Sequence, residues 1–387
     1  MEKLRIGDVC DILSGYAFKS ENYVDSGIRI IRISNVQKGH IEDNTPAFYP
    51  LDTKGLCKYM LEKGDLLMSL TGNVGRVAIL EEELLPAALN QRVACLRLKS
   101  NRILKNYLFY VLNNNFFEQE CIMASKGVAQ KNISTEWLKD YEIPLYALDQ
   151  QDKIVALLNS VQNVMSNRKR QLEKLDELVK ARFVEMFGDP VSNPMGWQVK
   201  PLMEMGYCKN GMNFHTGDSG IEMHCLGVGD FKEYSVIDGT EHLTTISLNE
   251  EPPLERMLQN GDIVFVRSNG NKSLVGRCVV VYPYDTPTTY SGFCIRYRLT
   301  GDEVIISYLL RVLKTDSMRK KMAGRGANIQ NLNQQILASL DIPLPPLELQ
   351  EQFAAFVAQV DKSKVAIQKA LDEAQLLFDS LMQKYFG

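Results

Sequence analysis

The sequence predicts an α+β protein made of two similar halves, in which two α+β heads are separated by two long helices that pair antiparallel as a coiled coil. Residues 125–188 recur without a gap as residues 324–387, so both halves end in the same unit at an offset of 199. Each copy closes with about 40 residues that lack glycine and proline, which favours a long helix. A repeat at a fixed offset indicates a duplicated architecture. We therefore expect a pseudo-twofold relation between the halves.

The repeat divides the chain into four segments. We predict a first head over residues 1–147, a spacer helix over 148–187, a second head over 188–345 and a second spacer helix over 346–387. The length of 387 residues, with 45% hydrophobic and 24% charged residues, is sufficient for two domains that each have a core.

Both heads contain the same order of strand, polar loop and strand. Residues 64–69 and 75–79 form this pattern in the first head, and residues 261–266 and 276–280 repeat it in the second. The second loop, 267–275, has four extra residues between the paired glycines. The scaffold is therefore repeated while the chemistry of the loop differs.

Further β-rich and helical stretches make each head α+β. The β-rich runs are 28–33 and 295–299, and the helical stretches lie near 105–121 and 305–322.

The two spacer helices carry apolar residues at heptad spacing. Each helix is on the order of 60 Å long, and its narrow apolar stripe suits one partner helix, for which the other copy is the obvious candidate. Parallel and antiparallel pairing are both sterically allowed, and pseudo-twofold closure favours the antiparallel pair. The alternative is an amphipathic helix that lies on its own head. The stripe consists of Ile154, Leu158, Val161, Met165, Leu172, Leu175, Val179 and Met186 in the first helix and of Phe353, Val357, Val360, Ile367, Leu371, Phe378 and Leu381 in the second.

One basic residue interrupts each stripe near its middle, Arg168 in the first helix and Lys364 in the second. Such a residue can set the register of the pair while its stem packs and its charge stays in water. The alternative is that both residues face a further protein.

Composition limits the partners and the compartment. The net charge of −3 neither indicates nor excludes a nucleic acid, because phosphate binding depends on where the basic residues lie. The chain start lacks the apolar run of a signal peptide, and no stretch approaches the roughly 18 apolar residues of a membrane span. We therefore expect a cytoplasmic protein that has no membrane partner. The eight cysteines include no C-x-x-C motif, which indicates buried or unreactive thiols rather than a zinc site or disulfides.

The motifs of the catalytic classes that we considered are missing from the sequence. DNA amino-methyltransferases carry an Asp/Asn/Ser-Pro-Pro-aromatic motif, and the nearest strings, at 251–254 and 344–347, lack both the polar and the aromatic end. Asn271 stands where a P-loop requires glycine. The four histidines have no carboxylate or cysteine partners at suitable spacing. We expect no catalytic residue, no metal site and no cofactor on this chain.

Several strings occur in a fixed, duplicated order. A head ends in residues 125–134, which are followed by Ile143-Pro144-Leu145 and by a long heptad helix with a glutamine near its start, and this order occurs twice. Supporting strings are 31–36 with Gly39, Gly64-Asp65 before a strand, Asn90-Gln91-Arg92, and 342–347. Over the full chain, this order resembles the specificity subunits of type I restriction-modification systems.

The resemblance implies two target-recognition domains that each read half of a bipartite asymmetric site in double-stranded DNA. In that family, modification subunits dock on the helices and methylate adenine, and restriction subunits translocate and cleave DNA. S-adenosylmethionine, ATP and Mg are thus expected only on partner subunits. The second head departs from the first, because residues 224–230 stand where the first head has residues 30–35 and contain no arginine. The role of Arg32 is therefore not expected to be duplicated.

Candidate DNA-binding residues lie in the head loops and near the repeated unit. Two readers spaced by a helical turn of about 34 Å, or a multiple of it, can reach successive major-groove faces. There Arg or Lys reads guanine and Asn or Gln reads adenine, while other basic residues hold phosphate. We predict base contacts from Thr71, Asn73 and Arg76 in the first head and from Arg267, Ser268, Asn269, Asn271 and Lys272 in the second. We predict phosphate contacts from Lys126, Lys131, Lys320, Lys321 and Arg325, and the resemblance adds Arg32 and Asn35 as DNA-binding residues.

Two other functions fit parts of the sequence. The duplicated helices fit a non-enzymatic structural adaptor that bridges two protein partners, with heads that bind peptides instead of DNA. A nuclease with an unrecognised carboxylate-lysine site is the third hypothesis, and it requires metal-dependent cleavage by the purified chain.

Overall fold

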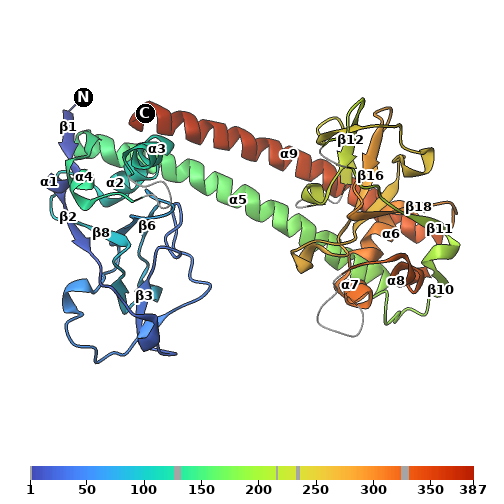
Figure 1. Ribbon diagram of the computed structural model, residues 1–387, viewed down its shortest axis with the longest axis horizontal. Helices are drawn as coiled ribbons and strands as arrows, with labels where there is room; N and C mark the ends of the chain where they lie inside the picture. Colours follow the sequence, from blue (N-terminus) through green and yellow to red (C-terminus); the bar gives the residue numbers. More distant parts are fainter. Residues whose placement is uncertain (1, 126–131, 215–216, 232–235, 324–330) are drawn as a thin grey trace. The chain divides into compact units, whose positions relative to one another are not determined.

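The computed structural model describes residues 2–125, 132–214, 217–231, 236–323 and 331–387. Contacts divide the chain into two compact units, Met1–Lys169 with Lys369–Gly387 and Arg170–Gln368. Each unit holds one head and a part of both long helices (Figure 1). The first unit is therefore not continuous in sequence, because the end of α9 (Leu347–Phe386) completes the unit that begins at the N-terminus, whereas the second unit is one continuous stretch.

The first head contains two main sheets and a short strand pair. The four-stranded sheet has the order β2 (Cys10–Ser14), β8 (Val93–Leu98), β5 (Leu66–Ser69) and β6 (Val77–Ile79), and the three-stranded sheet has the order β4 (Phe48–Tyr49), β3 (Ile28–Ile31) and β7 (Ala87–Leu89). β1 (Glu2–Arg5) pairs antiparallel with β9 (Glu142–Leu145). The strands β3 and β7 are parallel, whereas the four-stranded sheet is antiparallel.

The second head repeats this topology. Its larger sheet has the order β11 (Gly206–Asn210), β18 (Cys294–Leu299), β15 (Asp262–Val266), β16 (Cys278–Tyr282) and β13 (Val236–Asp238), and its smaller sheet has the order β14 (Thr245–Leu248), β12 (Ile221–Leu226) and β17 (Thr288–Tyr290). β10 (Gln198–Pro201) pairs with β19 (Asp341–Leu344). The added strand β13 lies parallel to β16 and has no counterpart among the described strands of the first head. The predicted α+β class and the duplication of the heads are confirmed.

Short helices cover the larger sheets. They are α1 (Ile6–Val9), α2 (Lys105–Leu112), α3 (Asn115–Ala124) and α4 (Thr135–Asp140) in the first head and α6 (Ile306–Leu313), α7 (Asp316–Ala323) and α8 (Gln334–Ala338) in the second. The helices α4 and α8 begin at equivalent caps. Ser134 accepts the N–H of Trp137 at 3.1 Å, and Asn333 accepts the N–H of Ile336 at 2.9 Å. Each cap satisfies a backbone donor that the first helical turn leaves free.

The long helices are α5 (Leu148–Phe187) and α9 (Leu347–Phe386). In the second unit, Lys364 pairs with Asp176 at 2.5 Å, and the rings of Phe353 and Phe187 lie 5.6 Å apart. As the chain advances along α5, its partners on α9 come from earlier positions, so the helices run antiparallel. Each predicted stripe residue is buried or half-buried. Lys364 forms an ion pair with the neighbouring helix, a contact that fits the first of its two predicted roles, the setting of register.

The helices also pack on their own heads, so the two alternatives for the stripe both hold in part. In the first unit, Ile154 and Leu158 of α5 share one core with Tyr107 of α2 and with Met382 and Phe386 of α9. In the second unit, Phe183 lies 5.8 Å from the ring of Tyr308 on α6 and 5.6 Å from that of Phe353 on α9. In each unit, the parts of α5 and α9 that it contains therefore belong to the core of its head.

Buried glutamines near the helix starts make the same contacts in both units. The side-chain oxygen of Gln151 accepts the N–H of Leu104, and that of Gln350 accepts the N–H of Ile305, both at 2.8 Å. Each amide nitrogen also donates to two backbone carbonyls of its head. The glutamine in the repeated unit is thus the residue that fixes the helix start to the head.

Candidate nucleic-acid interface

In the first head, three segments meet at the loop between β5 and β6. The N–H of Leu70 donates to the carbonyl of Arg92 at 3.0 Å, and the carbonyl of Leu70 accepts the N–H of Ile133 at 2.9 Å. The loop then turns at Gly72, whose φ of +69° lies in the left-handed region that favours glycine. Asn73 follows and is exposed. Backbone bonds therefore hold the base of this loop, and its tip faces solvent.

The loop between β15 and β16 is held in the same way in the second head. The N–H of Arg267 donates to the carbonyl of Phe293 at 2.7 Å, and the carbonyl of Arg267 accepts the N–H of Leu332 at 2.8 Å. These bonds match those of Leu70, so Arg267 occupies the position of Leu70. The two heads thus present different side chains from one backbone position.

The three base contacts predicted for the first head all fall on this loop. The guanidinium of Arg76 donates to the side-chain carbonyl of Gln37, which links the loop to the segment that follows β3. The hydroxyl oxygen of Thr71 is buried and has no hydrogen-bond partner among the described residues. Asn73 is exposed, and its backbone carbonyl accepts a hydrogen bond from the hydroxyl of Ser69.

Asn35 is buried, with 2% of its surface exposed, and its amide is used inside the head. Its oxygen accepts the N–H of Arg32 at 2.9 Å, and its nitrogen donates to the carbonyl of Glu42 at 2.8 Å and to the carboxylate of Asp43 at 3.0 Å. A base contact would require these bonds to break. We therefore assign Asn35 to the closure of this turn rather than to a base contact.

The equivalent turn in the second head supports this assignment. The carboxylate of Asp230 accepts the N–H of Gly227 at 2.8 Å, as Asn35 does for Arg32. Asp230 thus closes the turn, and a glycine takes the place of Arg32. This agrees with the expectation that the second head has no counterpart of that arginine, whose guanidinium donates to the carbonyl of Thr45.

The base contacts predicted for the second head lie on the longer loop, which folds on its own side chains. The side-chain oxygen of Asn269 accepts the N–H of Asn271 at 2.7 Å, and that of Asn271 accepts the N–H of Ser273 at 3.1 Å. The guanidinium of Arg267 donates to the carbonyl of Gly292 at 3.4 Å. Ser268 and Asn269 are half-buried, whereas Asn271 and Lys272 are exposed.

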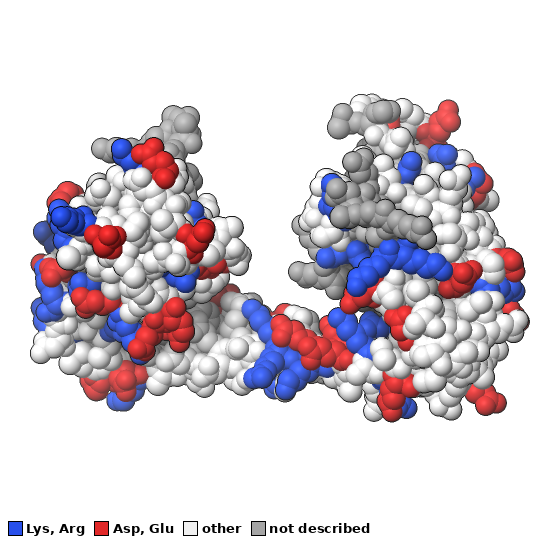
Figure 2. Space-filling view, turned by 90° about the horizontal axis from the view of Figure 1, so that it is seen from below, with Lys and Arg blue, Asp and Glu red and all other residues white. Residues whose placement is uncertain are grey.

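The basic residues predicted to hold phosphate are only partly described. Lys320 and Lys321 lie in the last turn of α7, and Lys321 pairs with Asp341 at 3.4 Å. Lys126, Lys131 and Arg325 lie outside the described residues. In the second unit, a band of Lys and Arg side chains crosses the face drawn in Figure 2, while acidic and basic side chains alternate on that of the first unit.

The structure adds residues that the sequence prediction missed. Arg92 and Phe293 stand at equivalent turns beside the two loops, and both are exposed. Arg277 is the counterpart of Arg76, because Val266 bonds to Arg277 as Ser69 bonds to Arg76, at 2.9 and 3.0 Å. The paired Gly-Arg sequences at 75–76 and 276–277 were a signal for Arg277. Phe293 had no such signal, because its side chain makes no hydrogen bond to a base edge.

The family model of the type I restriction modification DNA specificity domain matches residues 1–177 and 226–375. The chain belongs to this family. Among its relatives is the specificity subunit of the type I restriction enzyme StySPI from Salmonella potsdam. It is 24% identical over an alignment of 405 positions, gaps included, which covers 98% of this chain and 86% of the relative. The EcoKI specificity subunit of Escherichia coli K12 is 21% identical over 98% of this chain and 86% of the relative.

Solved structures show the same fold for this specificity-family chain. The S subunit of a type I restriction-modification system from M. genitalium matches with a TM-score of 0.54 at 16% identity, over 100% of this chain and 96% of the other. A chain from a study of complex assembly and conformational transition of the type I R-M system matches with a TM-score of 0.60 at 18% identity, over 100% and 97%.

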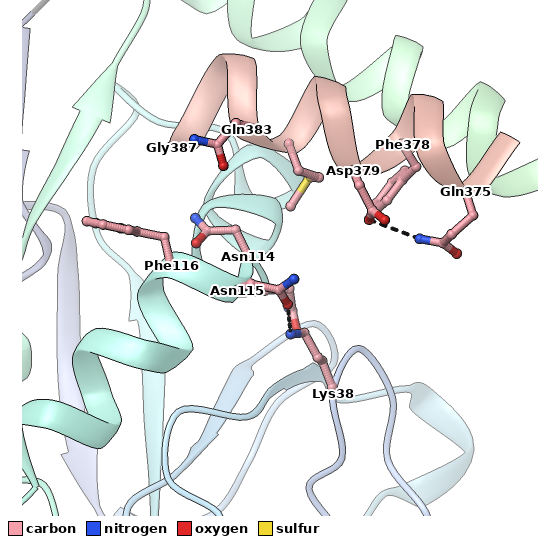
Figure 3. A pocket seen from close by; sticks show the side chains of 11 residues that line it. Lys38, Asn114, Asn115, Phe116, Gln375, Phe378, Asp379, Gln383 and Gly387 are labelled. Carbon is pink, nitrogen blue, oxygen red and sulfur yellow. Dashed lines mark hydrogen bonds between the residues drawn. The ribbon is translucent and has the colours of Figure 1, made fainter. Parts of the chain in front are cut away.

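Each unit also has a crevice between its head and the end of a long helix. In the first unit it has a volume of about 520 Å³, and Asn113–Phe116, Gln375, Phe378 and Asp379 are among its lining residues. Figure 3 shows Lys38 directed at Asn115, to which it donates at 2.6 Å, while it also donates to Glu118 at 2.7 Å. In the second unit, Asp176, Val179 and Lys314 line a crevice of about 270 Å³. Asp176 and Val179 correspond to Gln375 and Phe378 in the repeat, so equivalent helix positions contribute to both crevices.

The described residues include no group of three or more His, Cys, Asp or Glu side chains arranged to hold a metal ion. Within the same residues, no helix combines the length and apolar character that crossing a membrane requires.

Proposed function

We propose that this chain is the DNA sequence-recognition subunit of a type I restriction-modification complex, in which each head reads one half of a bipartite asymmetric site. One observation carries the proposal. Two heads of the same topology hold equivalent loops by the same backbone bonds, yet those loops differ in length and in side chains. Repeated scaffolds with different loops suit the recognition of two different half-sites.

The chain selects the site and does not itself make or break bonds. Its relatives are named specificity subunits of type I restriction enzymes. The resemblance to this family implies that methylation and cleavage lie on partner subunits. Adenine methylation and restriction would thus be directed to the site that this chain binds.

Base reading is assigned to the two loops. In the first head the candidates are Asn73 and Arg76, with Thr71 beneath them, and in the second head they are Arg267 to Asn269 with Asn271 and Lys272. An arginine that binds guanine through two hydrogen bonds contributes about 1–3 kcal/mol of discrimination against other bases. Lys320 and Lys321 are assigned to phosphate, which fixes position without specifying sequence.

A matched pair of variants tests these roles in the complex with its modification subunits. Arg267→Ala is expected to relax the preference at one base position in a DNA-site selection, because it removes hydrogen bonds to a base edge. Lys320→Ala is expected to weaken binding to all sequences equally and to reduce the salt dependence of binding by about one counterion. If Arg267→Ala leaves the preference at every base position unchanged and lowers affinity alone, then Arg267 is not a reader.

The long helices are the proposed docking surface for the modification subunits. In the first unit, α5 exposes Leu157 and Val164, and α9 exposes Leu376 and Leu377, with 40 to 70% of each side chain accessible. Exposed apolar groups on a helix pair suit helices of another protein. Restriction subunits are expected to join the same complex.

Val164→Glu tests this surface. The variant is expected to weaken co-purification with the modification subunits at least tenfold, because a carboxylate in an apolar contact loses its hydration. Its melting temperature should stay close to that of the wild type, since the position is exposed. Val155→Glu is the control that should unfold the first unit, because that side chain is buried in the core. If Val164→Glu assembles with the modification subunits as the wild type does, the subunits do not dock at this face of the helices.

Methylome sequencing of a host with and without the gene separates this function from the structural adaptor. A recognition subunit predicts adenine methylation at one bipartite motif that disappears with the gene. An adaptor predicts no motif that depends on it.

A further inference from the structure

The turns beside the two candidate reading loops exchange an arginine for a phenylalanine. In the first head, the side chain of Asn90 accepts the N–H of Arg92 at 3.2 Å, and in the second the hydroxyl of Ser291 accepts the N–H of Phe293 at 3.3 Å. Their carbonyls accept the N–H groups of Leu70 and Arg267, as described above. Phe293 therefore has the backbone position of Arg92.

A second contact confirms that these turns are equivalent. The backbone N–H of Gln91 donates to the carbonyl of Tyr16 at 3.0 Å, and the backbone N–H of Gly292 donates to the carbonyl of Met212 at 2.7 Å. The two turns are held from both sides by the same backbone bonds. The exchange of side chains at 92 and 293 thus occurs on a fixed frame.

The ring of Phe293 stands in solvent among polar groups. It is 60% exposed, and its carbonyl also accepts the N–H of Ser268 at 3.3 Å. The guanidinium of Arg267 donates to the carbonyl of the preceding residue, Gly292. A single exposed apolar residue needs no explanation by itself. This one is bonded through its backbone to Arg267 and Ser268, so an exposed phenyl group lies directly beside two candidate base readers.

The chemistry of the major groove limits what the ring can recognise there. A phenyl group offers no hydrogen bond to a base edge, and the apolar group that the bases display in the major groove is the 5-methyl of thymine. The neighbouring Arg267 suits guanine O6 and N7. The turn and the loop together therefore suit a thymine and a guanine in the same half-site.

We infer that Phe293 is a specificity-determining residue that contacts the 5-methyl group of a thymine in the half-site bound by the second head. The inference rests on the proposed function. In the first head the same position carries Arg92, whose guanidinium suits guanine or a phosphate oxygen. We therefore expect the thymine methyl to matter in the half-site bound by the second head.

The test uses the full complex with its modification subunits and a duplex that contains the motif found by methylome sequencing. Each thymine of both half-sites is replaced singly by uracil, which removes the methyl and keeps the base pair. One replacement is expected to weaken binding about fourfold, which corresponds to roughly 0.8 kcal/mol for one buried methyl group. The same replacement should have no effect on Phe293→Ala, and Phe293→Leu should retain part of it.

A matched control is Leu254→Ala in the same head. Leu254 is 85% exposed, and it precedes β15, whereas the reading loop follows that strand. This variant should keep the full uracil effect.

The inference is overturned if no uracil replacement weakens binding, or if the effect of the replacement persists in Phe293→Ala. A loss of affinity in Phe293→Ala that is equal for thymine and uracil would show that the ring packs on sugar or between bases, which also overturns it. If the complex binds no motif selectively, the proposed function itself has failed.

Discussion

Every cysteine except Cys57 is buried, and burial makes these thiols poor nucleophiles. The reactive form is the thiolate, whose charge is unfavourable away from water. Burial raises the pKa of Cys278 to about 11 and that of Cys10 to about 12. The scattered cysteines that the sequence offered are thus mainly core residues of the two heads.

A thiol titration at pH 8 measures this directly. We expect one thiol to react rapidly with an aromatic disulfide reagent in the native protein and all eight to react in denaturant. Raising the pH should speed the slow phase, since the buried groups lose their protons only near or above pH 11. The Cys57→Ser variant should lose the rapid phase. A rapid phase that includes a second thiol would contradict the burial of these side chains.

At single positions, the sequence located both loops but did not specify the hydrogen bonds that their side chains make. The repeated Gly-Asp and Gly-Arg pairs located both loops, because turn and strand chemistry is local. Asn35 has the residue type of an adenine reader, yet its amide is consumed by three hydrogen bonds within its turn. The place of Phe293 beside Arg267 depends on pairing between distant strands, which no local pattern specifies.

At the scale of the helices, heptad spacing predicted which face is covered. The stripe of α5 was read from residue type alone, and its members are buried or half-buried. The aromatic residues at the helix ends were outside the predicted stripe. Phe187 and Phe386 contact Tyr308 and Tyr107, at ring distances of 4.8 and 5.5 Å. These contacts attach the helix ends to the heads. They could not be predicted from the sequence, because their prediction requires the fold of each head.

Two adjacent leucines of α5 separate core packing from exposure. Leu158 is fully buried, whereas Leu157 is 40% exposed. Leu158→Ala is expected to destabilise the first unit by about 3 kcal/mol, because a buried cavity is added to the lost transfer free energy. Leu157→Ala should cost less than about 1 kcal/mol. Urea unfolding combined with hydrogen exchange of the α2 amides measures both effects. Equal losses for the two variants would contradict the packing of this helix.

At the scale of the whole molecule, the duplication extends to the connections. β1 pairs with β9 in the same register in which β10 pairs with β19, since Glu2 lies opposite Leu145 as Gln198 lies opposite Leu344. Phe386 occupies the place of Phe187 in the repeat. The chain ends of the first unit are therefore equivalent to the two ends of the connection 188–197 in the second. Only the sequence repeat was needed to predict this correspondence, because a duplicated chain inherits its junctions.

The connection 188–197 shows how such ends are joined. Gly188 follows α5 with φ +74°, and the indole N–H of Trp197 donates to the carbonyl of Phe187 at 3.2 Å. The side chain of Asn193 bonds to the backbone of Trp197 in both directions, at 2.7 and 3.0 Å. The connection is thus an ordered bridge between a long helix and the first strand of a head, and the repeat predicts that a copy of it can join the two ends of the first unit.

A circular permutant tests this equivalence. A copy of residues 189–197 is placed between Gly387 and Glu2, and the chain is opened so that it starts at Gln198 and ends at Gly188. We expect the permutant to fold, with a melting temperature within a few degrees of the wild type, and to bind the same DNA motif with its modification subunits. Both units keep their strands, helices and core contacts, and only the positions of the ends change.

The control permutant carries the same copied bridge but is opened between Leu158 and Asn159, inside α5. It should lose the first unit, because the break removes helix hydrogen bonds next to a fully buried side chain. If the permutant opened at 188–198 also fails to fold, then the two junctions are not equivalent and the duplication stops at the helices. If it folds but selects a different motif, the order of the heads along the chain contributes to recognition, and the two reading loops do not act as independent halves.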